Sequence, residues 1–376
     1  MTRHDIGTLV IGGGQAGLAV GYHLKRRRLP FVIVEKNQRV GDNWRSRWDT
    51  LRLFTPGRYN ALPGMPFPGA SSAFPTKDAA ADYLAAYARE FELPIRTGVR
   101  VDRLWRSGDR FVAACDGEEL SASNVVVATG AYHHPRVPPF AAELNGSIYQ
   151  IHSSEYRNRL QVHEGGVLVV GAGNSGAEIA TELARHHHTW LSGPDTGQEP
   201  TRAGGGIADR LVMPIMWLMA TRLTVKTLLG RKLRDRFLDP PRGIPLARVR
   251  RKDIIAAGVE RVGRTVGVRD GYPLLEDGRV LEVSNVIWCT GYRPDFSWID
   301  LAIPTRLGYP IHDRGIVDSI PGLYFVGLLF LYSLSSALLG GVGRDAEHIV
   351  DHINAHRVEH AFAGSKVFDS RNVSSR

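Results

Sequence analysis

The chain has 376 residues, of which 43% are hydrophobic and 23% are charged, and its formal net charge is +9. This length allows two domains of ordinary size, and this composition excludes fibrous and low-complexity proteins. The positive charge favours anionic ligands and surfaces. We expect no nucleic acid partner, because neither a basic-aromatic module nor zinc-ligand spacing accompanies the charge.

The two cysteines, Cys115 and Cys289, lie in apolar, strand-like runs, and no C-x-x-C pair is present. This context predicts buried free thiols rather than a disulfide. The three adjacent histidines at residues 186–188 point in different directions at a helix end, so we expect no metal site. The chain enters its first strand almost at once and without a signal-peptide pattern, which predicts a cytoplasmic location.

The first predicted unit is a strand, a glycine turn and a helix. The apolar residues 9–11 precede the G-x-G-x-x-G pattern of residues 12–17, whose members are Gly12, Gly14, Gln15, Ala16 and Gly17. The first glycine lets the chain turn, the second lets backbone approach a pyrophosphate, and the third lets helix pack on strand. The free N–H groups of the helix N-terminus then face the phosphates.

A second buried strand, residues 31–34, ends in Glu35 and is followed by Lys36. An acid about 20 residues beyond such glycines binds ribose hydroxyls and repels a 2′-phosphate. The first unit therefore predicts a dinucleotide whose ribose carries no phosphate.

A long irregular stretch separates this unit from the next regular elements. Prolines between residues 56 and 68 exclude helix and strand there, and a structureless stretch of this length is usually functional. Thr76 then opens an amphipathic helix that ends before Pro94. Short strands follow, and the buried strand of residues 125–127 ends in a tight turn formed by Ala128, Thr129 and Gly130.

The second half of the chain repeats the first. Apolar residues 167–170 precede a second glycine pattern with the members Gly171, Gly173, Asn174, Ser175 and Gly176. A later strand ends in Thr290, Gly291 and Tyr292, which echo the earlier Thr-Gly turn. Two chance matches, each with strand before and helix after, are improbable, so we expect an α/β fold with two dinucleotide-binding, Rossmann-like domains.

The domain limits follow from this repeat. The strand of residues 323–327, which ends in Gly327, and the helix of residues 342–356 most simply complete the first domain. We therefore expect an FAD-binding domain at 1–160 and 292–376, and an NADP-binding domain inserted at 161–291.

The two units differ where their second strands end. In the second unit Ser192 replaces the acid, so it could donate to a 2′-phosphate, and Arg202 could supply positive charge. Asp195 lies nearby and would instead suit NAD. The balance favours NADP in the second unit and FAD in the first, since a flavin beside a nicotinamide permits hydride transfer.

At this point the chain resembles the flavin-containing monooxygenases (class B flavoprotein monooxygenases), in particular their short bacterial branch and the plant indole-pyruvate type. The resemblance spans nearly the whole chain and rests on the order of six motifs. These lie at residues 12–17, 41–44, 128–130, 152–156, 171–176 and 290–292.

The resemblance implies roles for particular residues. FAD would lie on the first glycine unit, with Glu35 at its adenosine ribose and Val101 near the adenine. Asp42, Trp44 and Leu53 would lie near the flavin, and NADPH on residues 171–175. In such enzymes NADPH reduces the flavin, and dioxygen adds to give a hydroperoxyflavin. This species passes one oxygen atom to a substrate and releases the other as water, so no protein side chain is expected to be the catalytic group.

The substrate is left open at this point. A small lipophilic molecule could be oxygenated at nitrogen or sulfur, by Baeyer-Villiger chemistry, or by oxidative decarboxylation. One alternative is an NADPH-dependent flavin reductase or oxidase. Another is a non-enzymatic, redox-sensing flavoprotein associated with a membrane partner.

The segment 211–252, inside the expected NADP-binding domain, begins apolar and ends strongly basic. Charged residues and a proline interrupt it, so it is too polar for a membrane span. Three interpretations remain: a helix packed on its own core, a homodimer contact, or a peripheral contact with an anionic membrane surface.

Overall fold

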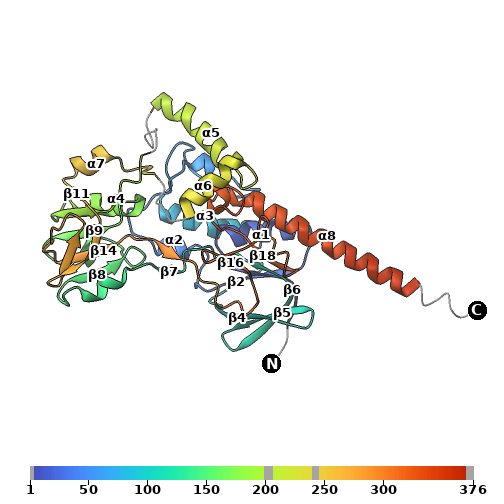
Figure 1. The fold of residues 1–376 in the computed structure, drawn as a ribbon. Coiled ribbons are helices and arrows are strands. Elements are labelled where there is room, and N and C mark those ends of the chain that lie inside the picture. The colour runs from blue at the N-terminus through green and yellow to red at the C-terminus, as the bar shows by residue number, and fades with distance from the viewer. Residues whose placement is uncertain (1–3, 199–205, 239–244, 370–376) are drawn as a thin grey trace, which may run out of the picture.

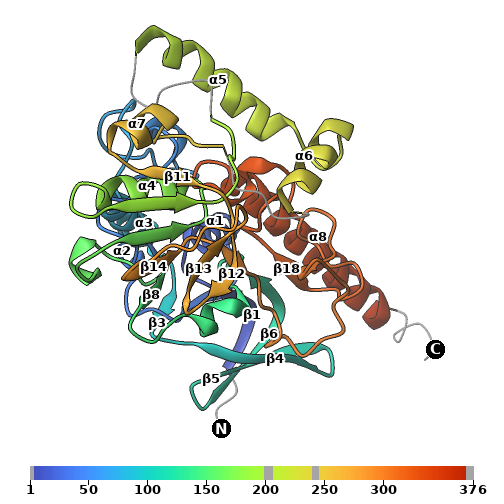
Figure 2. The same ribbon diagram turned by 60° about the vertical axis from the view of Figure 1, so that its left-hand side comes forward.

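The computed structural model describes residues 4–198, 206–238 and 245–369. Figures 1 and 2 show two sheets, each accompanied by helices, and an outlying arm made of α5 (Gly206–Arg222) and α6 (Leu228–Leu238). The expected α/β class with two Rossmann-like units is confirmed.

The first sheet has seven strands. They follow the order β3 (Ile95–Thr97), β2 (Phe31–Glu35), β1 (His4–Ile11), β6 (Glu118–Val127), β5 (Arg110–Cys115), β4 (Val101–Ser107), with β18 (Leu323–Phe325) also paired to β6. β1 pairs in parallel with β2 on one side and with β6 on the other, whereas β4, β5 and β6 form an antiparallel meander. The strand order therefore reverses between β1 and β6, and ligands bind outside the carboxyl ends of strands at such a point.

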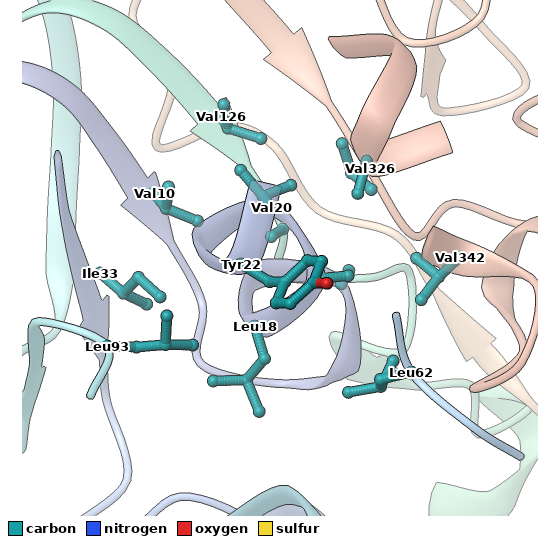
Figure 3. Packing of buried hydrophobic residues seen from close by; sticks show 14 of the residues in the cluster. Val10, Leu18, Val20, Tyr22, Ile33, Leu62, Leu93, Val126, Val326 and Val342 are labelled. Atoms are coloured by element: carbon teal, nitrogen blue, oxygen red, sulfur yellow. The ribbon is translucent and has the colours of Figure 1, made fainter. Parts of the chain in front are cut away.

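Three long helices accompany this sheet: α1 (Gln15–Arg26), α3 (Lys77–Glu90) and α8 (Val342–Asp369). Figure 3 shows Leu18, Val20 and Tyr22 of α1 amid side chains of β1, β2, β6 and α8, and α1 is buried through Leu24. The predicted helix start is confirmed, because Thr76 Oγ1 accepts a hydrogen bond from Ala79 N at 3.1 Å. Through β18 and α8, the C-terminal part of the chain returns to the first sheet.

The irregular stretch between β2 and α3 contains only a short helix, α2 (Asp42–Arg45), and a 3₁₀ turn (Gly57–Tyr59). Two tyrosines of α3 hold it in place. Tyr83 Oη accepts from Leu62 N and donates to Met65 O, both at 2.7 Å. Tyr87 Oη donates to a further carbonyl at 2.7 Å. The stretch is therefore ordered by specific buried hydrogen bonds, although it has almost no regular structure.

The second sheet has five parallel strands. Their order is β11 (Glu260–Val262), β10 (Thr189–Ser192), β9 (Val167–Val170), β14 (Asn285–Trp288), β8 (Tyr149–His152). The helices α4 (Asn174–Leu183) and α7 (Arg251–Ala256) belong to this unit. Because β8 pairs with β14, the second sheet begins before residue 161, the expected boundary.

The remaining short elements connect and decorate the two units. Three antiparallel ribbons form between β7 (His134–Pro135) and β15 (Tyr292–Arg293), between β12 (Thr265–Arg269) and β13 (Tyr272–Leu275), and between β16 (Thr305–Arg306) and β17 (Tyr309–Pro310). Further 3₁₀ turns lie at Pro139–Glu143, Arg159–Gln161 and Leu334–Ala337. The β7–β15 ribbon joins the two segments by which the chain passes between the sheets.

The arm lies inside the sequence limits expected for the NADP-binding domain, but it packs on the first unit. Val225 N donates to Tyr332 O at 2.8 Å, and Arg344 donates to Thr221 O, also at 2.8 Å. Trp217 packs against Tyr59 in a tilted arrangement with ring centroids 5.1 Å apart. No helix of the described ranges is long and apolar enough to cross a membrane.

Candidate functional site

In the first glycine turn, Gly12 and Gly17 are required by the protein itself. Gly12 has φ +111°, and a Cβ there would lie 2.7 Å from the carbonyl oxygen of Ala128. A Cβ on Gly17 would overlap the carbonyl oxygen of Gly12. These two glycines therefore allow the chain to turn and α1 to pack closely on β1.

Gly14 has no such explanation within the protein. Its φ is −78°, which any residue adopts, and a Cβ there would meet only Asn43 Nδ2, at an ordinary 3.6 Å. Apart from this amide, no protein atom approaches the position of its Cβ, at the N-terminus of α1, where unpaired N–H groups favour phosphate. The turn fits a pyrophosphate that approaches Gly14.

The second glycine turn repeats this division. Gly171 has φ +111° and lies against the carbonyl of Cys289, and a Cβ on Gly176 would overlap the carbonyl oxygen of Gly171. Gly173 has φ −77°, and nothing lies within 4 Å of the position of its Cβ. The protein alone requires the first and third glycines of both turns, and leaves the second to a ligand.

Glu35 lies at the mouth of the first turn. Its Oε2 accepts from Gly13 N at 2.6 Å, and its Oε1 accepts from Asn37 N and Nδ2 at 2.9 and 2.6 Å. The adjacent Lys36 is exposed. Val99 N donates to Glu35 O at 3.0 Å, so the segment that leads to Val101 passes beside the end of β2. This arrangement suits an adenosine ribose at Glu35 with its base toward Val101.

The residues expected near the flavin lie on and after α2. Asp42 forms ion pairs with Arg39 and Arg45, both at 3.1 Å, which lower the pKa of its carboxyl against the opposing effect of burial. Leu53 is buried in the core of the first unit. Trp44 Nε1 is buried and has no hydrogen-bond partner among the described residues. Because a buried donor rarely stays unpaired, this indole fits a ligand that supplies the acceptor.

The carboxyl ends of β6 and β18 complete this side of the site. Ala128 N donates to Ile11 O at 2.8 Å, and Thr129 Oγ1 lies 3.2 Å from His133 Nε2. Gly130 has φ +73° and open space at its Cβ position. After β18, a Cβ on Gly327 would lie 2.7 Å from that of Ala16, and Gln15 Nε2 donates to Ala337 O at 3.3 Å. These contacts place both turns beside the first turn of α1.

The turn after β14 lies where the two units meet. Tyr292 Oη accepts from Arg47 at 2.7 Å, and Gly291 O accepts from His152 Nε2 at 3.1 Å. Thr290 Oγ1 donates to Arg136 O. Burial lowers the pKa of His152, so this imidazole is neutral and holds the junction together rather than carrying charge. The segment after α2 also crosses the junction, since Trp48 packs in the core of the second unit.

The prediction for Ser192 does not fit the geometry. Its side chain is fully buried, and its hydroxyl lies 2.8 Å from both Gly263 O and Thr265 Oγ1. It accepts a further hydrogen bond from Thr265 N at 2.9 Å. The hydroxyl is therefore committed to joining β10 to β12, and has no capacity left for a 2′-phosphate. Arg202 lies outside the described residues.

Two other arginines lie beside the loop that follows β10. Arg251 forms an ion pair with Asp195, and Arg261 donates to Gly193 O at 2.8 Å. Burial lowers the pKa of Arg261, against the opposing effect of Asp195. Arg251 belongs to the basic tract that the sequence linked to a membrane, and only the fold brings it next to Asp195. These cations, rather than Ser192, are the groups that suit a phosphorylated ribose.

Two side chains of α4 are held by the segment before α7. Asn174 donates to Pro245 O at 3.1 Å and accepts from Ala247 N at 2.9 Å. Glu178 accepts from Arg248 at 3.1 Å, but burial dominates and raises the pKa of Glu178 to about 7. Ser175 is half-buried at the start of the helix. The backbone at the start of α4, rather than the Asn174 side chain, is thus left for a phosphate.

Comparison with known proteins bears on this pair of sites. The profile of the pyridine nucleotide-disulphide oxidoreductases matches residues 9–199. An uncharacterized CzcO-like oxidoreductase of Geobacillus kaustophilus is 41% identical over 94% of this chain and 100% of its own length. A probable indole-3-pyruvate monooxygenase of Arabidopsis thaliana is 30% identical over 78% of this chain and 76% of its own. The chain belongs to the flavin-containing monooxygenase family.

A solved structure agrees with this membership. The flavin-containing monooxygenase of Stenotrophomonas maltophilia is 28% identical, with a TM-score of 0.75 over 94% of this chain and 99% of that one. The expected class of enzyme, a flavoprotein oxidoreductase of the flavin-containing monooxygenase family, is therefore confirmed. FAD and NADPH, the cofactors expected from the sequence, are those that the membership supports.

The two thiols of this flavin-containing monooxygenase homologue are not arranged for dithiol chemistry. Burial raises the pKa of both Cys115 and Cys289 to about 12, so both are protonated at neutral pH. The chain has no other cysteine. Dithiol chemistry needs a pair of reactive thiolates, and this chain does not provide one.

Proposed function

We propose that this protein is an FAD- and NADPH-dependent monooxygenase that oxygenates a small lipophilic substrate. It would transfer one oxygen atom of dioxygen to the substrate and reduce the other to water, with NADPH as the electron donor. The observation that carries the proposal is the pair Gly14 and Gly173. Each is a glycine that its own protein surroundings do not require, at the N-terminus of a helix, in one of two units that meet at Tyr292 and Arg47.

The residues fit the two cofactors in distinct ways. Backbone N–H groups at residues 12–16 would hold the FAD pyrophosphate, and Glu35 the hydroxyls of its ribose. Backbone N–H groups at residues 173–175 would hold NADPH, with Arg251 and Arg261 near its 2′-phosphate. The FAD-binding part would comprise 1–160 and 292–376, except that β8 would belong to the NADP-binding part. The NADP-binding part would comprise 161–291, except that the arm would belong to the FAD-binding part.

Bound FAD would accept hydride from NADPH and activate dioxygen. The protein would position the two cofactors and exclude water from the site. Leu53 is buried to 6% exposure in the apolar cluster against which Trp44 packs, and the unpaired Trp44 indole offers a donor beside that cluster. A dry, apolar site protects a reactive oxygen species from water and favours lipophilic substrates.

Turnover with isotopically labelled dioxygen tests the proposal. The FAD-loaded protein and NADPH are offered a thioether, a tertiary amine, a cyclic ketone and a 2-keto acid. We expect NADPH consumption to rise with one class and the label to appear in its product. Release of all consumed oxygen as hydrogen peroxide, with no labelled product, would instead identify a flavin reductase or oxidase. The cytoplasmic location stays a prediction, which cell fractionation would check.

A further inference from the structure

The outer face of the arm carries an unusual concentration of exposed apolar side chains. Ile215, Leu218 and Met219 of α5 are 58%, 53% and 53% exposed, and Leu228 and Leu229 of α6 are 73% and 67% exposed. Elsewhere among the described residues, large exposed apolar side chains occur one or two to an element. A concentration of exposed apolar side chains marks a surface that contacts something else.

The geometry of α5 separates this face from the face that packs on the protein. Trp217 packs against Tyr59, and Thr221 O accepts from Arg344, so residues 217 and 221 face the first unit. Ile215, Leu218, Met219 and Arg222 follow the spacing i, i+3, i+4, i+7, which places them together on another face of the helix. The apolar patch is thus not needed to hold the arm.

Exposed cations border the patch: Arg222, Lys226, Arg231, Lys232 and Arg236. None forms an ion pair with another described residue. The one acidic side chain described in the arm, Asp235, is already paired with Arg234 at 3.0 Å. The face is therefore apolar at its centre, and at its edge it carries positive charges that no acidic side chain of the described residues neutralises.

This charge decides between possible partners. In a symmetric dimer the same patch faces itself, so the five cations of one copy would oppose those of the other. Like charges brought together at an interface are costly. A nucleic acid would leave Ile215, Leu218 and Met219 without a role, because its recognition uses phosphate contacts and stacked aromatic side chains.

We propose that the outer face of the arm docks on an anionic lipid surface. The apolar side chains would enter the boundary between headgroups and acyl chains, and the cations would contact the phosphates and carboxylates of the headgroups. Figures 1 and 2 both show α5 at an extremity of the molecule, where a flat bilayer can reach it. The proposal concerns peripheral binding only and does not depend on the reaction that the protein catalyses.

Vesicle sedimentation of the FAD-loaded full chain tests this proposal. We expect binding to phosphatidylcholine vesicles that contain phosphatidylserine, little binding to pure phosphatidylcholine, and weaker binding as salt increases. The double variant R231E/K232E should bind at least about thirtyfold more weakly, since the loss of each Lys or Arg near an anionic bilayer costs about fivefold and the added carboxylates are repelled as well. The variant L228E/L229E should also lose binding.

A matched control separates the arm from net charge. R89E/R306E reverses two exposed arginines elsewhere on the first unit, changes net charge equally, and should bind nearly as the original chain does. All variants should retain the original melting temperature. As a measurement without substitution, phosphatidylserine vesicles should slow amide hydrogen exchange in α5 and α6.

Several outcomes would overturn the proposal. These are equal loss of binding in the control, absence of binding to phosphatidylserine vesicles at low salt, or unchanged hydrogen exchange in the arm. A dimer that L228E/L229E dissociates, without vesicle binding, would assign the face to a second copy. Capture of an acidic protein without vesicle binding would assign it to a protein partner.

Discussion

Alanine substitutions in the two glycine turns separate cofactor contact from folding. In G14A the new Cβ meets only Asn43 Nδ2 at 3.6 Å, and the backbone φ of −78° suits alanine. Because alanine allows the unfolded chain fewer conformations than glycine does, the substitution adds about 0.4–1 kcal/mol to the free energy of unfolding. Alanine is a poorer N-cap than glycine by a similar amount, roughly 0.5–1 kcal/mol. The cofactor-free protein should therefore change in stability by less than about 1 kcal/mol. In G17A the Cβ would overlap Gly12 O, so α1 must move from β1, at about 1–3 kcal/mol or more.

Two measurements on each variant check this reasoning. G14A should melt close to the original cofactor-free protein but bind FAD at least tenfold more weakly, or about 1.4 kcal/mol. G173A, with nothing within 4 Å of its Cβ position, should keep FAD and lose affinity for NADPH. Fluorescence titration gives the FAD affinity, and anaerobic reduction rates give that for NADPH. The reasoning is refuted if G14A binds FAD normally, or if G14A and G17A melt at the same lowered temperature.

Four further substitutions test other parts of the structure. R251L should weaken NADPH binding at least tenfold and leave NADH binding unchanged, because a charged hydrogen bond is worth about 1.5–3 kcal/mol. S192A should keep the preference for NADPH over NADH. Steady-state assays with both nucleotides check this, and a loss of the preference in S192A but not in R251L would contradict it. The pKa of Glu178 is about 7 in the folded protein and 4.5 ordinarily, so between these pH values the folded chain holds a proton that the unfolded chain has lost. The free energy of unfolding should therefore fall by about 3 kcal/mol as the pH rises from 4.5 to 7. E178Q should remove this fall in urea unfolding at about pH 5 and pH 8, and an unchanged pH dependence would argue against it. D345N removes a fully buried carboxylate that accepts a hydrogen bond from Arg314 at 3.2 Å. It should lower the free energy of unfolding by about 3–5 kcal/mol, measured by thermal unfolding. An unchanged melting curve would show the pair to be dispensable.

The features that sequence predicts well here are local ones. In each glycine turn, the carbonyl that forces the third glycine belongs to the first glycine of the same turn, as with Gly17 and the carbonyl of Gly12. Glu35 is predicted because the distance from strand to strand in a β-α-β unit is nearly constant. The helix that Thr76 caps has its signal within one turn.

Features that depend on distant pairing were not predictable in the same way. Ser192 sits at the expected place, but β12 approaches it from much later in the chain and takes its hydroxyl. Arg251 reaches Asp195 only because the start of α7 folds back beside the loop that follows β10. β8 belongs to the second sheet through its pairing with β14, and no local pattern shows this. The arm likewise lies within the second unit in sequence, between β10 and β11, but packs on the first unit through Tyr332.

The reaction of the NADPH-reduced protein with dioxygen tests the central claim most directly. The FAD-loaded chain is reduced anaerobically and mixed rapidly with oxygenated buffer in the absence of substrate. The account predicts an absorbance band unlike that of oxidised or reduced flavin, which decays slowly and shortens in lifetime when a substrate is added. Immediate return of the oxidised spectrum with one peroxide released for each flavin would contradict it.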